Sequence, residues 1–244
     1  EEKEEKKEVS EKVCNINEIL NNKCDKGEMV NEQIGEVYDY LKDDYLKNFT
    51  NESTVIKTEN VIFQISTIED QKKEKNPEIS SIDLGECEQL LKKENNINDE
   101  DQLIIIKSDM RKNGSTYVQY EVFHPNTLIP LDLNICEKTS ITLNVPVKLD
   151  NSTNNKYKDL AELGYDLFDT ESLFYNDLCT PYTTETGTDL SLNDRKELLT
   201  NSIALFCQDG CTFQGYNSTI QKAKCSCTAQ IGSIVTYMKS LNFS

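Results

Sequence analysis

Cysteines are the residues of this chain with the most informative chemistry. There are nine, and four lie close together as Cys207-x3-Cys211-x13-Cys225-x-Cys227. Cysteines at this density pair as disulfides in oxidising compartments, which favours the secretory route. The alternative is a zinc site made of the same four thiols, but a Cys-x-Cys pair fits zinc spacing poorly and no histidine helps. We therefore expect disulfides and no metal. The other five cysteines are Cys14, Cys24, Cys87, Cys136 and Cys179.

Two cysteine pairs can be predicted from their positions. Cys87 and Cys136 flank segments of predicted sheet, and closing so long a loop stabilises the fold by about 4 kcal/mol on a chain-entropy estimate. Cys14 and Cys24 bracket a segment short enough to close as a local disulfide. Because the cysteine count is odd, we expect at least one thiol to have its partner outside this chain.

Other side chains with catalytic or metal-binding chemistry are scattered. His124 lies in a turn before a proline, and a lone histidine is more often structural than catalytic. The acidic turn 98–101 could hold Ca²⁺, but it lacks the EF-hand spacing. Residues 189–195 could form a carboxylate or cation site, although a helix start capped by Asn193 or Asp194 is the favoured interpretation. Nucleotide-binding, zinc-protease and hydrolase motifs are absent, so we expect no catalytic residue and no cofactor.

The acidic balance of the chain excludes whole classes of partner. The formal net charge is −17, and only Arg111 and Arg195 are arginines among the 26 basic residues. Nucleic acids and anionic membrane surfaces need clustered Lys and Arg. We therefore expect no nucleic-acid partner, and we attribute the negative charge to solubility.

N-x-S/T sequons, the acceptors of N-linked glycans, recur along the chain. Most lie in polar, turn-like sequence, where an acceptor asparagine must sit. Asn48 and Asn51 are so close that a glycan on one could block the other. We predict glycans at Asn113, Asn151 and Asn217. The candidate sites are Asn48, Asn51, Asn113, Asn151, Asn217 and Asn242.

Hydrophobic periodicity predicts the elements that must position these residues. Apolar residues at helical spacing predict helices, and alternating patterns predict strands. Asn113-Gly114 lies between two predicted strands and is typical of a hairpin. Pro146 favours an edge position for the last predicted strand. Helices are expected at 29–46, 83–93 and 157–168, and strands at 53–67, 102–108, 116–123 and 140–149.

These elements predict a mixed α+β fold that is mainly β. We divide the chain into an acidic helical N-terminal segment, a β-sandwich-like domain, a linker with a short helix, and a cysteine-rich tail. The proposed boundaries are 1–50, 51–150, 151–178 and 179–244.

Cys211, Cys225 and Cys227 of the cysteine-rich tail are separated by 13 residues and by one residue. This is the spacing of the third, fourth and fifth cysteines of an EGF-like module, which the tail therefore resembles. The resemblance implies the pairs Cys179–Cys211 and Cys207–Cys225, with Cys227 bonded to a cysteine beyond this chain. The interval from Cys179 to Cys207 is too long for a standard module, so the match is partial.

A further set of motifs runs from about the middle thirties to the end of the chain. They are Cys179-Thr180-Pro181-Tyr182-Thr183, Gly187-Thr188-Asp189, Leu192-Asn193-Asp194-Arg195, Cys207, Cys211, Gly215-Tyr216 and Lys224-Cys225-Ser226-Cys227, with upstream pieces at 61–67, 82–87 and 120–136. In these motifs the chain resembles an extracellular segment of large protist surface proteins. That resemblance implies a position just outside a membrane-spanning helix, with a further cysteine after the last motif.

The sequence favours a cell-surface or extracellular location. The chain does not begin with Met and has neither a signal peptide nor an apolar run of about 20 residues, so we expect a processed chain or a piece of a longer one, anchored to a membrane only through missing downstream sequence. Our first hypothesis is a non-enzymatic structural building block that assembles into filaments with other copies or with surface proteins through strand edges. The alternatives are a carbohydrate- or protein-binding module (an adhesin or receptor ectodomain) and, least favoured, a secreted enzyme.

Overall fold

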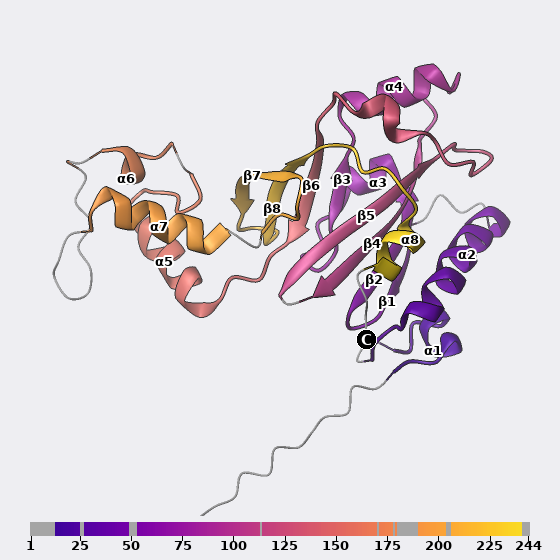
Figure 1. The fold of residues 1–244 in the computed structure, drawn as a ribbon, viewed down its shortest axis with the longest axis horizontal. Helices are drawn as coiled ribbons and strands as arrows, with labels where there is room; N and C mark the ends of the chain where they lie inside the picture. The colour runs from indigo at the N-terminus through magenta and orange to yellow at the C-terminus, as the bar shows by residue number, and fades with distance from the viewer. Residues whose placement is uncertain are drawn as a thin grey trace, which may run out of the picture.

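The computed structural model shows a mixed α/β protein with two four-stranded antiparallel sheets at its centre (Figure 1). A mixed fold was expected from the sequence, and that coarse expectation is confirmed. The structure describes residues 13–24, 27–48, 53–112, 114–169, 171–177, 179, 190–203 and 206–240.

The first sheet has the strand order β1-β2-β4-β5, with β1 at Thr54–Lys57, β2 at Val61–Thr67, β4 at Ile104–Lys112 and β5 at Ser115–Phe123. The single strand predicted at 53–67 is two strands, because the Thr58 hydroxyl bonds to Asn60 and to the Val61 carbonyl and closes a turn between them. The predicted hairpin is confirmed: β4 and β5 pair along their whole length, and Gly114 has a φ of 79° in the turn. Asn113 itself lies outside the described residues.

The second sheet has the order β3-β6-β8-β7, with β3 at Ser81–Asp83, β6 at Ile141–Pro146, β7 at Cys211–Asn217 and β8 at Lys222–Cys227. The prediction that Pro146 marks an edge strand is wrong, because β6 lies between β3 and β8. Proline is tolerated there because it is the last residue of the strand. This sheet crosses the proposed boundaries at 150 and 179, since β6 and β8 come from opposite sides of them.

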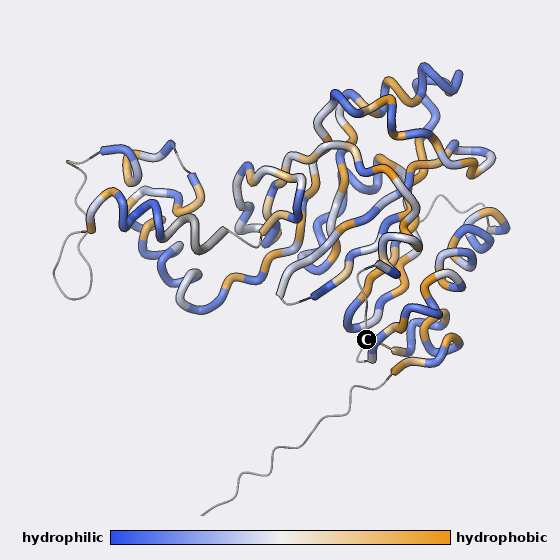
Figure 2. Tube along the Cα trace, in the orientation of Figure 1, coloured by the Kyte–Doolittle hydropathy of each residue, from blue (hydrophilic) through white to orange (hydrophobic). Residues whose placement is uncertain are grey.

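Helices α1 (Ile16–Leu20), α2 (Asn31–Asn48) and α8 (Ile234–Ser240) lie on the outer face of the first sheet (Figure 1). The predicted helix at 29–46 is confirmed as α2, and Figure 2 shows the alternation of polar and apolar residues along it. Asn15 and Glu18 form a reciprocal capping box that starts α1, a helix that the sequence analysis did not predict.

The remaining helices are α3 (Ile68–Lys73), α4 (Glu86–Glu94), the 3₁₀ helix η1 (Leu133–Cys136), α5 (Asn151–Glu162), α6 (Leu173–Asn176) and α7 (Leu192–Ile203). The helix predicted at 157–168 begins earlier, at Asn151, because the Asp150 carboxylate accepts the backbone N–H of Thr153 as an N-cap. The expected helix start near 193 is also found. Its cap is Ser191, whose hydroxyl accepts from the Asp194 N–H, instead of the predicted Asn193 or Asp194.

Two apolar clusters hold these elements together. One lies between the sheets and includes Ile105, Val118, Leu143 and Cys225, and it extends to the aromatic residues of the α5–α7 region. The other packs α2 and α8 against the opposite face of the first sheet. Each face of the first sheet is therefore buried, which explains why consecutive residues of β2, and of β4 from Ile104 to Met110, are all buried even where they are polar.

Four disulfides form among the described cysteines. Cys14–Cys24, Cys87–Cys136 and Cys207–Cys225 are paired as predicted. The predicted pair Cys179–Cys211 is wrong, because Cys211 lies directly opposite Cys227 on neighbouring strands and bonds to it. The predicted external partner of Cys227 is wrong for the same reason, and the thiol left over is the exposed Cys179. The EGF-like tail that implied these pairs is not confirmed.

Candidate functional site

The candidate residues noted in the sequence do not form one site. His124 sits in a turn, where its Nδ1 accepts the Asn126 N–H at 3.2 Å. In the acidic turn 98–101 the backbone carbonyl of Asp99 accepts from Lys92, and the described residues contain no group of three or more His, Cys, Asp or Glu side chains placed to hold a metal. The four thiols of the zinc alternative are consumed in two disulfides. Residues 180–189 lie outside the described residues.

A groove instead forms where the chain leaves the second sheet. β8 ends at Cys227, and α8 begins at Ile234 on the outer face of the first sheet. The linker 228–233 between them passes the edge strand β5 (Figure 1). A cavity lies on either side of this linker. The Ile234 N–H donates to Glu121 Oε1 at 2.8 Å, which fixes the end of the linker to β5.

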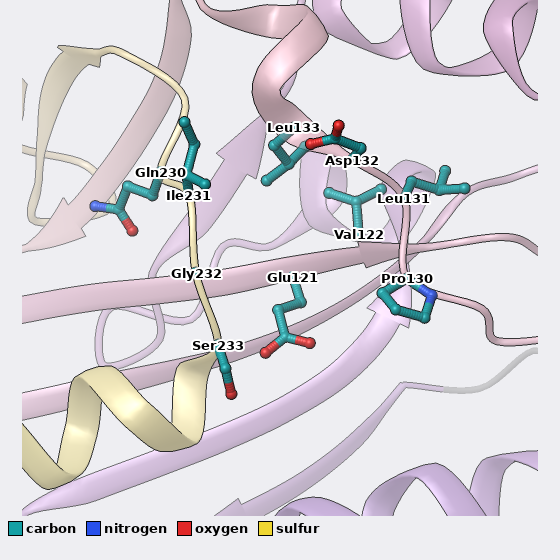
Figure 3. Close-up of a pocket in the computed structure, with 10 residues that line it drawn as sticks. All are labelled: Glu121, Val122, Pro130, Leu131, Asp132, Leu133, Gln230, Ile231, Gly232 and Ser233. Atoms are coloured by element: carbon teal, nitrogen blue, oxygen red, sulfur yellow. The ribbon is translucent and has the colours of Figure 1, made fainter.

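The first cavity has a volume of about 260 Å³ (Figure 3). Apolar side chains of Val122, Leu131 and Leu133 line one wall, and the carboxylate of Glu121 lies on the floor between that wall and Ser233. Glu121 also accepts from the Tyr38 hydroxyl at 2.5 Å, so one carboxylate joins β5 to both α2 and α8. Burial, followed by the bond to Glu121 and its charge, raises the pKa of Tyr38.

The second cavity, on the other side of the linker, has a volume of about 570 Å³. It brings together Tyr117 from β5, Asp209 from the turn before β7, and Tyr237 from α8. Burial raises the pKa of Tyr237, and the nearby Tyr117 and Asp209 raise it further. Amides and hydroxyls complete the lining: Gln119, Gln208, Gln230, Ser233, Thr236 and Ser240.

Gln230 carries an unsatisfied polar atom in this groove. Its Oε1 is buried and has no hydrogen-bond partner. Figure 3 shows its side chain pointing away from Glu121 and Pro130. A buried acceptor without a partner carries a desolvation cost of about 1–3 kcal/mol.

The edges of the first sheet are closed by side-chain amides. Gln208 accepts the Val118 N–H at 2.7 Å and donates to the Val118 carbonyl at 3.1 Å. On the opposite edge, Asn22 donates to the Val55 carbonyl at 2.9 Å and accepts the Lys57 N–H at 3.2 Å. These amides occupy backbone groups that another strand would need, so they oppose the assembly through this sheet that the sequence suggested.

A second cluster of ionisable groups is buried between the sheets. Lys107 Nζ is 3.0 Å from both Asp109 Oδ1 and Ser80 Oγ. Ser80 donates its backbone N–H and its hydroxyl to the Asp109 carboxylate, each at 2.6 Å. Burial lowers the pKa of Lys107, while the charge of Asp109 opposes that shift.

A serine beside a lysine of lowered pKa can act as a nucleophile–base pair. Ser80, Lys107 and Asp109 are, however, each 0% exposed, so no substrate reaches the hydroxyl. Lys222 extends the cluster, donating to the Glu74 carbonyl at 3.2 Å, and burial lowers its pKa to about 8. We assign this cluster a structural role between the sheets.

Comparison with known proteins adds no relative: no family model, curated protein or solved structure matches the chain. The four disulfides are typical of proteins from oxidising compartments. In the part of the chain that the structure describes, no helix is both long and apolar enough to cross a bilayer.

Proposed function

We propose that this chain is a non-enzymatic binding module of an extracellular or cell-surface glycoprotein, and that the groove beside the linker 228–233 binds a neutral carbohydrate. The observation that carries this proposal is the lining of the groove. Tyrosine rings offer flat surfaces for stacking, and amides and hydroxyls offer both donors and acceptors. A polyhydroxylated ligand needs both kinds of group.

The charge of the groove narrows the class of ligand. Among the described residues that line the two cavities, none is Lys, Arg or His, while Glu121, Asp132 and Asp209 are acidic. An anionic ligand would meet carboxylates without a balancing cation there, in a chain of net charge −17. A neutral sugar avoids that repulsion.

The secreted-enzyme alternative has less support than binding. Glu121 is engaged by Tyr38 and by the Ile234 N–H, so it is committed to holding helices against the sheet. The only nucleophile–base geometry described above, that of Ser80 and Lys107, is closed to solvent.

A structural building block remains the second candidate, and β7 is the observation that favours it. This strand forms one edge of the second sheet, and its residues are partly or fully exposed. In this second proposal the two sheets stack as a sandwich-like body, and β7 pairs with the same strand of another copy. A downstream segment then anchors the chain to a membrane.

A glycan-binding screen tests the carbohydrate proposal. The disulfide-bonded chain is applied to immobilised neutral and anionic oligosaccharides at low and at high salt. We expect the chain to be retained on a neutral sugar. This retention should not depend on the salt concentration, because the ligand carries no charge. Retention only on anionic sugars, or none at all, would contradict the proposal.

A further inference from the structure

Residues of three sequons that are distant in sequence line two adjoining cavities. The two cavities share Lys148 and Gln221. Ser115, the third residue of the Asn113 sequon, lines one of them. Asn151, together with Ser218 from the Asn217 sequon, lines the other. Predicted glycans therefore concentrate around these two cavities.

The cavity at Asn151 has the lining of a sugar site. Its volume is about 290 Å³, close to the lower limit of about 300 Å³ for typical ligand pockets, which suits a single sugar ring better than a chain of sugars. Tyr157 and Tyr216 form its aromatic wall, with ring centroids 6.0 Å apart and an edge-to-face angle of 83°. Asn154 and Gln221 add amide donors and acceptors.

Asn151 itself is exposed and occupies the first position of α5, on the rim of this cavity. A glycan on its side chain would start within reach of both tyrosines. We propose that Asn151 is N-glycosylated and that its first sugar packs into this cavity, against Tyr157 and Tyr216, as part of the folded structure. The inference rests on the proposed extracellular location, but it does not depend on the groove beside the linker.

The modification is a group transfer from an oligosaccharide carried on a lipid diphosphate. The Asn151 amide nitrogen forms a bond to C1 of the first sugar, and the bond from C1 to the diphosphate oxygen breaks. The diphosphate leaves with the electron pair of that bond, and the amide loses one proton. No oxidant or reductant is needed.

Asn217, whose neighbour Ser218 lines the same cavity, provides a matched control. It is exposed at the end of β7, and its Oδ1 accepts the Thr219 and Ile220 N–H groups in its own turn. Asn217 does not line the cavity. A glycan there is expected to extend into solvent without packing against Tyr157 and Tyr216.

The experiment uses the whole chain secreted from a eukaryotic host, with glycans trimmed to a single sugar. Glycopeptide mass spectrometry should find Asn151 occupied. The remaining sugar carries an acetyl group, whose methyl can be followed by NMR. The methyl of the sugar on Asn151 should resonate upfield of the methyl of the sugar on Asn217, because the first lies over the rings of Tyr157 and Tyr216. Asn151→Gln should lower Tm by about 2–4 °C, the shift that corresponds to about 1 kcal/mol in a chain of this size. Thr219→Ala, which removes the Asn217 sequon but keeps the Asn217 side chain and its turn bonds, should not lower Tm.

Each contrary result has a distinct meaning. An unmodified Asn151 in a chain that is glycosylated elsewhere would overturn this inference alone. If Asn151 is glycosylated but the acetyl methyl of its sugar has the same chemical shift as that on Asn217, the sugar does not pack into the cavity. A chain with no glycan at any sequon would overturn both this inference and the proposed extracellular location.

Discussion

Gln208 and Val118, which are 90 residues apart, are joined by two hydrogen bonds that imitate a neighbouring strand. The side-chain amide accepts the Val118 N–H and donates to its carbonyl, and Gln208 is itself 8% exposed. The turn that carries Gln208 also carries Asp209 into the second cavity. The same contact therefore closes the edge of β5 and places one wall of the proposed binding groove.

Gln208→Ala should destabilise the protein by about 1–3 kcal/mol, because both backbone groups of Val118 lose their partner. The free energy of unfolding in urea measures this effect, and gel filtration should show more self-association through the opened edge. Gln214→Ala, at an exposed position of β7, is the control and should change neither quantity. Equal effects of the two substitutions would contradict the assigned role of Gln208.

The pair Lys107–Asp109 should show strong energetic coupling. Asp109→Ala leaves a buried ammonium without its carboxylate, and we expect a loss of about 3–5 kcal/mol. The double variant Lys107→Met/Asp109→Leu removes both charges and should be clearly more stable than Asp109→Ala. A double-mutant cycle in urea gives the coupling energy, and additive effects would argue against a buried ion pair.

Lys222 should make stability rise with pH above neutrality. Its folded-state pKa is about 8 against 10.5 for an ordinary lysine. At pH values below both of these pKa values, Lys222 is protonated in the folded and in the unfolded state. The folded protein then bears the full cost of burying a charged ammonium group. Between the two pKa values the unfolded state binds more protons, so the free energy of unfolding increases with pH.

Unfolding in urea at about pH 7 and about pH 9 tests this prediction, in a range that stays below 10.0, the ordinary tyrosine pKa, above which the unfolded chain would lose protons that the buried tyrosines keep. Because burial also lowers the pKa of Lys107, Lys222→Met should reduce the increase without abolishing it, whereas the exposed Lys224→Met should retain all of it. If all three proteins have the same pH slope, Lys222 does not titrate as described.

The revised disulfide pattern predicts one titratable thiol in the denatured, unreduced chain. Peptide mapping should recover a fragment that links Cys211 to Cys227, and Cys179→Ser should remove the remaining thiol. A crosslinked fragment containing Cys179 and Cys211 would instead restore the EGF-like pairing.

The local elements could be predicted from the sequence wherever one periodicity dominates. The α2 helix and the β4–β5 hairpin follow from helical spacing and from Asn113-Gly114. The predictions of local structure are wrong where one residue has more influence on the backbone than the composition of the segment around it. Asp150 starts a helix in a stretch that resembles a linker, and Pro146 is harmless because it ends its strand.

The candidate site could not be predicted in this way, because its residues come from β5, the turn before β7, the linker and α8. No sequence spacing relates Tyr117 to Tyr237. The buried cluster did leave a signal that the sequence analysis missed: Lys107 and Asp109 are two residues apart in a strand, so their charges share a face of an otherwise apolar segment.

Titration calorimetry of a neutral oligosaccharide from the screen, against the wild type and Tyr237→Ala, tests the central claim most directly. Tyr40→Ala on α2, 39% exposed and away from the groove, is the matched control. We predict that Tyr237→Ala weakens binding by at least about tenfold, which corresponds to about 1.4 kcal/mol, while Tyr40→Ala binds like the wild type. Unchanged affinity of a folded Tyr237→Ala protein would contradict the assignment of the groove as the carbohydrate site.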